Sequence, residues 1–223
     1  MHLFIVGGEF VEDELRRKFG PGHRYDFCPA AAPDLLARLA AADAAFDLRP
    51  HPELHYEQPR QPLFYDATRQ SLAQVFHREA PPFGPVFGLC ALPTLLDRSL
   101  LEVSLYRPQD ADALAATCAA LGTDYRAVQD RAGLVTPRVV CMIINEACYT
   151  LQEGTASVRD IDLGMKLGTN YPRGPFEWAN AIGVARVYET LEALWHDTHE
   201  ERYKACPLLK TMYLRGEEFE VAS

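Results

Sequence analysis

The stretch DRAGLVTPRVVCMIINEACYTLQEGTASVRDIDLGMKLGTNYPRGPFEWANAIGV, residues 130–184, carries the clearest structural pattern in the chain. Apolar side chains recur in its first third at the spacing of an α-helix. The residues that would share one face are Val140, Ile143, Ile144, Ala147 and Leu151. Pro137 suits the first turn of this helix, which we expect to run to Gly154.

Further helices are predicted after this one. Ser157 and Asp160 have the spacing of a capping box, which predicts a second helix that ends at Gly168. Pro175 suits the start of a third helix and Gly183 its end. The spacing of apolar residues after Gly183 predicts a fourth helix, and CPLLKTMYLRG, residues 206–216, a fifth. We therefore expect residues 131–223 to form an all-α domain.

Residues 1–130 instead alternate between apolar runs of strand length and helical patterns. LFIV, residues 3–6, reads as a buried strand that leads into Gly7 and Gly8 and then a helix. The other predicted strands lie within residues 40–48, 62–67, 84–92 and 100–106. Residues 110–121 form an alanine-rich helix that Gly122 would cap. This alternation predicts an α/β domain over residues 1–130.

Composition limits the kinds of partner and compartment. The formal net charge of the 223 residues is -9, so we expect no nucleic-acid partner, because no basic surplus exists to displace counterions. No apolar run approaches the roughly 20 residues of a membrane helix, and the first residues lack the pattern of a signal peptide. The six cysteines form no C-x-x-C pair and are expected to be buried thiols. We therefore expect a cytoplasmic protein without a structural metal.

The motifs within residues 130–184 follow in a fixed order: D-R-x-G, N-E-A, E-G, D-I-D, Y-P-x-G-P-F and I-G. This combination resembles the helical C-terminal domain of the 3-hydroxyacyl-CoA dehydrogenase family. LLKTMYLRG, residues 208–216, resembles the closing segment of that domain, and residues 88–103 resemble the family's G-L-H-F-F-N-P segment that ends in E-V. The resemblance implies a Rossmann-like N-terminal domain, reduced in comparison with the family, followed by a helical dimerisation domain.

The resemblance also implies a chemistry. Family members transfer a hydride between NAD and C3 of an acyl-CoA, with a histidine as general base, a glutamate that orients it, and a serine and an asparagine that hold the substrate oxygen. In this chain the histidine position falls on Cys90, the glutamate on Glu102, the asparagine on Pro137 and the serine on Ser71. A thiol cannot replace the two-nitrogen imidazole, and proline has no side-chain donor. We treat Cys90, Glu102 and Ser71 as vestigial catalytic positions.

The dinucleotide-binding signature is also incomplete. G-x-G-x-x-G needs glycines for the turn, for the approach of the pyrophosphate and for helix packing. The chain offers Gly7, followed by Glu9, which repels an anion, and Phe10, which blocks it. Asp26 is a candidate for the ribose-binding acid, with a turn residue as the alternative. We therefore expect no cofactor.

Several of these residues have structural alternatives. Cys90 suits core packing better than a nucleophile, and Glu102 could cap a backbone N–H or pair with Arg98 or Arg138 instead of lining a ligand pocket. His196 and His199 could imitate a metal pair, although a solvated helix end explains them more simply. Asn145 and Glu146 match the family pattern and could equally fix the helix to its neighbours.

These observations predict a catalytically degenerate relative of the 3-hydroxyacyl-CoA dehydrogenases. It would act by binding an acyl-CoA-like ligand or an enzyme partner, or as a dimeric scaffold. The alternative is an active NAD-dependent oxidoreductase with an altered site. A homodimer is expected through the helical domain, for which the candidate buried aromatic residues are Phe176, Trp178 and Trp195.

Overall fold

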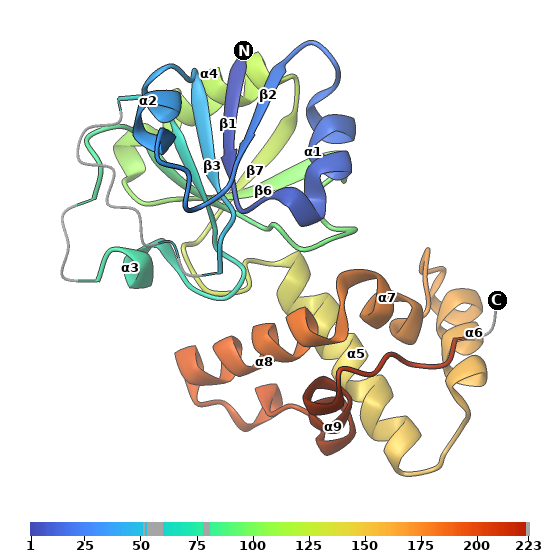
Figure 1. The fold of residues 1–223 in the computed structure, drawn as a ribbon. Helices are drawn as coiled ribbons and strands as arrows, with labels where there is room; N and C mark the ends of the chain where they lie inside the picture. Colours follow the sequence, from blue (N-terminus) through green and yellow to red (C-terminus); the bar gives the residue numbers. More distant parts are fainter. Residues whose placement is uncertain (51, 53–59, 78–80, 222–223) are drawn as a thin grey trace. The chain divides into compact units, whose positions relative to one another are not determined.

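The computed structural model describes residues 1–50, 52, 60–77 and 81–221. The chain divides into two compact units, Met1–Val135 and Thr136–Ser223, each of which is described by itself (Figure 1). The first unit is a sheet covered by helices, and the second consists of helices. None of the helices in the described residues is long and apolar enough to span a bilayer.

The sheet of the first unit contains seven strands in the order β2-β1-β3-β4-β5-β6-β7. The strands are β1 (His2–Val6), β2 (Arg24–Cys28), β3 (Ala44–Asp47), β4 (Leu63–Asp66), β5 (Val86–Leu89), β6 (Leu100–Leu105) and β7 (Asp124–Val128). All neighbouring pairs are parallel except β5 and β6, which are antiparallel. The chain passes from β1 to β2 on one side and then to β3 on the other, so the order reverses at β1, where ligands of open α/β sheets usually bind.

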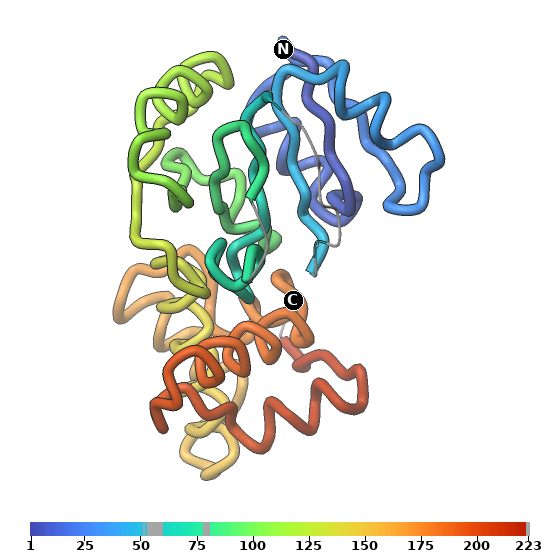
Figure 2. The backbone as a smooth tube through the Cα atoms, turned by 90° about the vertical axis from the view of Figure 1, so that its left-hand side faces the viewer, coloured from blue at the N-terminus to red at the C-terminus, as the bar shows by residue number. Residues whose placement is uncertain are grey.

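Helices cover both faces of this sheet. They are α1 (Glu12–Phe19), α2 (Leu35–Ala40), α3 (Leu72–Val75) and α4 (Ala111–Leu121), with single turns η1 (Glu9–Val11) and η2 (Pro108–Asp110). Leu15 of α1 and Leu114 of α4 pack in one apolar cluster, whereas Leu35 of α2 and Leu72 of α3 pack in the other. Figure 2 shows α4 and α2 on opposite sides of the strands.

The second unit is built around its first helix, α5 (Thr136–Gln152). The others are α6 (Val158–Thr169), α7 (Pro175–Ile182), α8 (Val184–Thr198), the turn η3 (Glu201–Tyr203) and α9 (Pro207–Arg215). Helices α6, α7, α8 and α9 all contact α5. The five helices predicted from the sequence are confirmed, and two starts lie where predicted: the Ser157 hydroxyl accepts the Asp160 N–H, and Pro175 opens α7. Two predicted ends were wrong: α5 ends at Gln152 and not at Gly154, and α6 passes Gly168 and ends at Thr169, where Asn170 takes the left-handed cap conformation.

The sequence prediction omitted two strands, β2 and β7. Both lie at the edges of the sheet, and β7 has the sequence DYRAV, in which exposed charged residues interrupt the apolar pattern. An edge strand has only one strand neighbour, so it needs less apolar surface and carries a weaker signal. Residues 49–62, which contain four prolines and no periodic pattern and are therefore predicted to form a loop, lie largely outside the described residues.

Candidate functional site

The turn after β1 is the position where a Rossmann-like fold would hold a pyrophosphate. Gly7 has a left-handed φ of 68°, and η1 follows directly after Gly8. A Cβ atom on Gly7 would lie 2.5 Å from Cγ of Arg49, so the space that glycine leaves open is filled by that arginine. A Cβ on Gly8 would lie 2.5 Å from Cγ2 of Ile5. Side chains of the protein itself, Arg49 and Ile5, therefore pack directly against the backbone of these two glycines.

Arg49 is held over this turn by an ion pair at the end of β3. Its Nε donates to Oδ1 of Asp47 at 2.8 Å and its Nη2 to Oδ2 at 2.6 Å. The Asp47 carboxylate is 2% exposed and the Arg49 side chain 13%. A two-bond contact between a guanidinium and a buried carboxylate fixes the geometry of both groups. Nothing in the local sequence indicates that Arg49 reaches Gly7.

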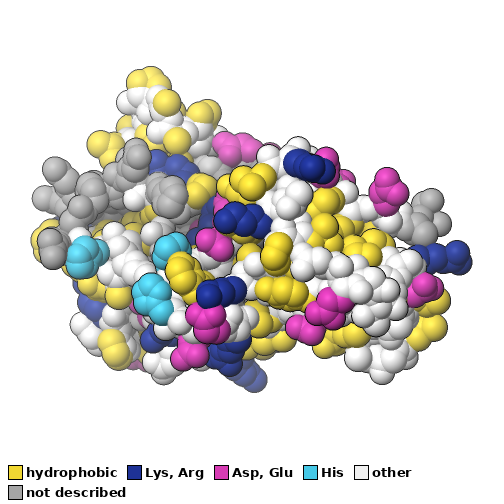
Figure 3. Space-filling model, turned by 90° about the horizontal axis from the view of Figure 1, so that it is seen from below, with side chains coloured by type: hydrophobic (Ala, Val, Ile, Leu, Met, Phe, Trp, Pro, Cys, Tyr) yellow, Lys and Arg dark blue, Asp and Glu magenta, His cyan; other side chains and the backbone are white. Residues whose placement is uncertain are grey.

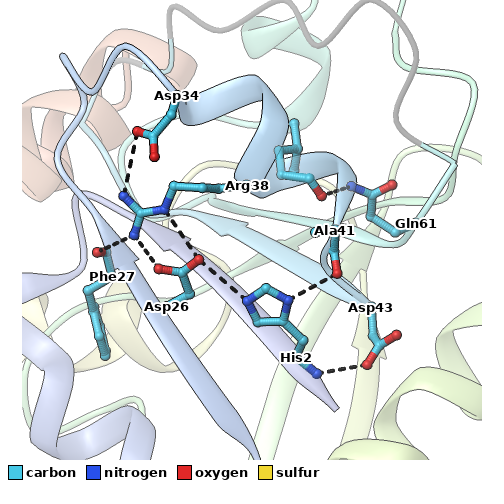
Figure 4. Close-up of polar contacts among 9 residues, drawn as sticks. His2, Asp26, Phe27, Asp34, Arg38, Ala41, Asp43 and Gln61 are labelled. Atoms are coloured by element: carbon cyan, nitrogen blue, oxygen red, sulfur yellow. Dashed lines mark hydrogen bonds and ion pairs between the residues drawn. The ribbon is translucent and has the colours of Figure 1, made fainter.

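Asp26, the candidate ribose-binding acid, lies inside β2 and is neither at its end nor in a turn. Figure 4 shows its carboxylate between Arg38 of α2 and His2 of β1. Arg38 donates to both oxygens of Asp26, and Nε2 of His2 lies 3.4 Å from Oδ2. The Arg38 hydrogen bond holds the pKa of Asp26 below its usual value. The Asp26 carboxylate, predicted to contact a ribose, thus contacts two side chains of the same chain, Arg38 and His2.

Cys90 and Glu102 are brought together by the antiparallel pairing of β5 and β6. Leu89 lies opposite Val103, and one further step of the same register sets Cys90 opposite Glu102. Cys90 is 6% exposed, and its Sγ accepts the Leu92 N–H at 3.4 Å. The Glu102 carboxylate accepts the backbone N–H of Val135 at 3.1 Å. Two of the alternatives considered for Glu102 are therefore present in the structure: it caps a backbone N–H, and its Oε1 pairs with Nη1 of Arg98 at 3.9 Å.

The surroundings of Cys90 also contain a buried acid, Asp66, at the end of β4. Its Oδ1 accepts the backbone N–H and the hydroxyl of Thr68 and, at 3.2 Å, the N–H of Ala91. Burial raises the pKa of Asp66, and burial together with the nearby Asp66 raises the pKa of the Cys90 thiol far above the range of a nucleophile. In the sequence, Asp66 is recognisable only as the last residue of a predicted strand, so nothing there indicates its place beside Cys90.

Ser71 does not join Cys90 and Glu102 through any contact of the described residues. Its hydroxyl caps α3 by accepting the Gln74 N–H at 3.2 Å, and the Gln74 side chain accepts the Ser71 N–H at 2.7 Å. This reciprocal arrangement is a capping box. The carboxylate of Asp130 accepts the N–H groups of Leu72 and Ala73 at 2.8 and 3.0 Å. The side chains of Ser71 and Asp130 thus accept the N–H groups at the start of α3.

Two motif residues of the helical unit also have structural partners. Asn145 accepts the Cys206 N–H at 2.8 Å and donates to the Lys204 carbonyl at 2.9 Å, which fixes the chain before α9 to α5. Asp162, the second acid of D-I-D, accepts the N–H groups of Phe176 and Glu177 at 2.8 and 3.1 Å. It caps α7 from α6. These two motif residues thus hold neighbouring helices of the unit together.

The two histidines considered as a metal pair, His196 and His199, lie on the surface, and His77 is exposed as well. The ring of Trp195 lies 5.0 Å from that of His196 and 5.4 Å from that of His199, both edge-on. Within the described ranges, no group of three or more His, Cys, Asp or Glu side chains could hold a metal ion. Both histidines of the i, i+3 pair therefore lie next to the ring of Trp195.

The helical unit matches the model of a known protein family. Residues 133–219 match the model of the 3-hydroxyacyl-CoA dehydrogenase C-terminal domain. Over 93 residues the chain is 45% identical to the 3-hydroxyadipyl-CoA dehydrogenase of Escherichia coli K12, and over 91 residues 37% identical to a 3-hydroxybutyryl-CoA dehydrogenase of Bradyrhizobium diazoefficiens. These matches cover 42% and 41% of this chain but only 20% and 31% of the two relatives.

Solved structures extend the likeness to the whole fold. The (S)-3-hydroxybutyryl-CoA dehydrogenase of Ralstonia eutropha matches 98% of this chain and 95% of its own, with a TM-score of 0.72 at 20% identity. The 3-hydroxybutyryl-CoA dehydrogenase of Escherichia coli K12 is 32% identical, with a TM-score of 0.59, over 69% of this chain and 32% of its own. The predicted fold, a Rossmann-like unit followed by a helical unit, is confirmed. Residues 133–219 are therefore similar to the C-terminal domain of the 3-hydroxyacyl-CoA dehydrogenases, and the chain spans less than a third of the length of the two relatives.

Proposed function

We propose that this chain is a catalytically degenerate member of the family that acts by binding or assembly and not by NAD-dependent hydride transfer. The observation that carries the proposal is the position of Arg49, whose side chain occupies the space above Gly7. In a dinucleotide-binding turn that space is left for the pyrophosphate, which approaches the backbone directly. A bound dinucleotide would have to displace a buried, two-bond ion pair between Asp47 and Arg49.

The remaining cofactor contacts fit NAD equally poorly. Glu9 and Phe10 are exposed at the turn itself, where an acidic side chain repels phosphate. Helix α1 begins only after the η1 turn, so its N-terminus does not follow the glycines directly. Asp26 is engaged by Arg38. The residues present therefore do not fit the cofactor, and no catalytic step is assigned to it.

Cys90, at the predicted position of the general base, also argues against hydride transfer. A general base must exchange a proton near neutral pH, and burial raises the pKa of the Cys90 thiol far beyond that range. Pro137, at the asparagine position, is buried in the first turn of α5 and offers neither an amide side chain nor an N–H. Glu102 keeps its carboxylate but accepts the Val135 N–H.

We also propose a homodimer formed through α6. Leu163 and Leu167 are 45% and 77% exposed on this helix, and a Cβ on Gly164 or Gly168 would meet nothing within 4 Å. Apolar side chains next to open glycine positions suit the close packing of a second helix. Figure 3 shows further apolar side chains at the surface among acidic and basic ones. The candidate aromatics Phe176 and Trp178 are buried, at 0% and 9% exposed, and so cannot supply this surface.

The ligand of such a protein would be an acyl-CoA-like molecule or an enzyme partner, since the family's helical domain is retained while the dinucleotide turn is filled. Six free cysteines fit a reducing compartment such as the cytoplasm. The proposal requires that the protein bind a thioester or a protein without oxidising or reducing anything.

Binding and turnover test this directly. The purified protein is titrated with NADH and with acetoacetyl-CoA while tryptophan fluorescence is followed, and turnover is measured by nicotinamide absorbance. The 3-hydroxyadipyl-CoA dehydrogenase of Escherichia coli serves as the active control. We expect no NADH binding below about 1 mM and no turnover. Saturable NADH binding together with turnover would establish the alternative, an active oxidoreductase with an altered site.

The dimer is tested by sedimentation velocity. Leu167→Glu places a charge on the exposed stripe of α6 and should yield monomers, whereas Leu214→Glu, at a 70% exposed position of α9, should leave the dimer intact. Circular dichroism checks that both variants fold. A wild-type protein that sediments as a monomer, or two variants that dissociate equally, would refute this interface.

A further inference from the structure

A hollow of about 420 Å³ lies in the first unit, where α1, the segment before β6 and the turn from α4 into β7 meet. Its lining contains neither Ser71, Cys90 nor Glu102, although its lining residue Arg98 lies 3.9 Å from the Glu102 carboxylate. The volume falls in the range of small-molecule sites, roughly 300 to 1,000 Å³. The residues that line it are Arg17, Lys18, Asp97, Arg98, Ser99, Ala119, Gly122, Thr123 and Asp124.

Cationic side chains from two separate segments converge on this hollow. Arg17 and Lys18 come from the last turn of α1, and Arg98 comes from the segment before β6. All three have partners within the protein, and Nη1 of Arg98 lies 3.9 Å from Oε1 of Glu102. Nε of Arg17 donates to Asp97 at 2.9 Å, and Nζ of Lys18 donates to the carbonyls of Arg98 and, at 3.2 Å, Ser99. Cations that are already oriented lose less side-chain entropy when an anion binds.

Three cationic side chains and two carboxylates line the hollow, and a third carboxylate, Glu102, lies outside the lining at 3.9 Å from Arg98. Asp97 and Asp124 are its two carboxylates, and both stabilise the charged form of Lys18. Burial nevertheless lowers the pKa of Lys18, so these carboxylates do not fully offset the loss of water around the ammonium group. An anion in the hollow would supply the missing compensation. This contrasts with the acidic balance of the whole chain, whose net charge is -9.

One wall of the hollow has room for a group larger than the anion. Ala119 is exposed on α4, and a Cβ on Gly122 would meet nothing within 4 Å. The hydroxyls of Ser99 and Thr123 belong to the same lining. Guanidinium groups recognise phosphate oxygens with paired hydrogen bonds, and hydroxyls suit the polar body of a small organic phosphate.

We propose that this hollow binds a phosphate monoester carried on a small organic group, with Arg17, Lys18 and Arg98 as the cations that receive the phosphate. This site is independent of the proposed loss of dehydrogenase activity. The phosphate monoester could belong to a free nucleotide or sugar phosphate, or to the ribose 3′-phosphate of a coenzyme A thioester. The two sources are distinguished by comparing coenzyme A with dephospho-coenzyme A.

Isothermal titration at low ionic strength tests the site with AMP, inorganic phosphate, coenzyme A and dephospho-coenzyme A as probes. Ala119→Phe should fill the hollow without removing a charge and weaken AMP binding at least about tenfold. Ala120→Phe changes the neighbouring exposed position of α4, which does not line the hollow, and should bind as the wild type does. Raising the salt concentration should weaken binding to the wild type.

The outcomes separate as follows. Binding of AMP that Ala119→Phe alone weakens supports the site, and tighter binding of coenzyme A than of dephospho-coenzyme A identifies the thioester as the source. Equal binding of these two with retained AMP binding identifies a free organic phosphate. Absence of AMP binding at about 1 mM, or equal effects of Ala119→Phe and Ala120→Phe, overturns the proposal. Unfolding curves of both variants confirm that each folds.

Discussion

The backbone N–H of Val135 donates to the Glu102 carboxylate over 3.1 Å. Val135 is the last residue of the first unit and lies 33 positions after Glu102. Glu102, which the sequence predicted at the position of a base-orienting glutamate, therefore fixes the chain that leaves the sheet. Asp130 adds to this by accepting the N–H groups of Leu72 and Ala73, and the Gly133 N–H donates to the Thr68 carbonyl at 2.8 Å. Residues 130–135 are thus tied to β6, to α3 and to the segment after β4.

Replacing Glu102 should loosen the chain end at Val135. Glu102→Ala removes the acceptor of the Val135 N–H, so we expect a loss of about 1 kcal/mol in the free energy of unfolding and faster hydrogen exchange of the Val135 amide. Glu102→Gln keeps an acceptor oxygen and should have a smaller effect. Exchange measured by NMR would contradict the assignment if the Val135 amide were equally protected in the wild type and Glu102→Ala.

Replacing Asp162 should weaken α7. Its carboxylate accepts the N–H groups of Phe176 and Glu177 at the start of that helix, and loss of such a cap typically costs about 1 to 2 kcal/mol. Urea unfolding of Asp162→Ala measures this cost. Glu153→Gln, an exposed charge of the same unit, is the control and should stay within about 0.5 kcal/mol of the wild type. Equal stability of the two variants would show that the cap contributes nothing.

The ion pair of Asp26 predicts a loss of stability in acid. Arg38 holds the pKa of Asp26 below 3.8 in the folded protein, so the unfolded chain binds a proton more readily than the folded one. The stability from this pair is complete above the unfolded pKa and is lost as the pH falls through the lower, folded pKa. Wild type and Asp26→Asn should therefore differ most near neutral pH and converge below about pH 4. A difference that persists unchanged to about pH 3 would argue against this linkage.

The thiols should be unreactive in the folded protein. All six cysteines are buried, and burial raises the pKa of Cys118 to about 11 and that of Cys90 further. With an aromatic disulfide reagent at about pH 8, we expect little reaction in buffer and all six thiols to react in denaturant. A single fast thiol in buffer that disappears in Cys90→Ser would mean that Cys90 is a nucleophile, as the alternative oxidoreductase requires.

The sequence by itself determined the helical unit almost completely. Its helices begin and end at Pro175, Gly183 and the Ser157 cap because these signals act within a few residues, and such local rules survive in any surrounding. The central strands were equally evident, since a strand buried on both faces is a continuous apolar run. The edge strands β2 and β7 were missed because exposure weakens that pattern.

Only the tertiary structure decided what the site residues do. Arg49 lies over Gly7, Asp130 caps a helix 58 positions before it, and Glu102 bonds Val135, and none of these pairs is joined by a local pattern. Sequence spacing could place Cys90 and Glu102 in the family's order, yet it could not tell which partner each would take. Such partners depend on how distant segments pack, because hydrogen bonds and burial are set by atoms that approach only in the folded chain.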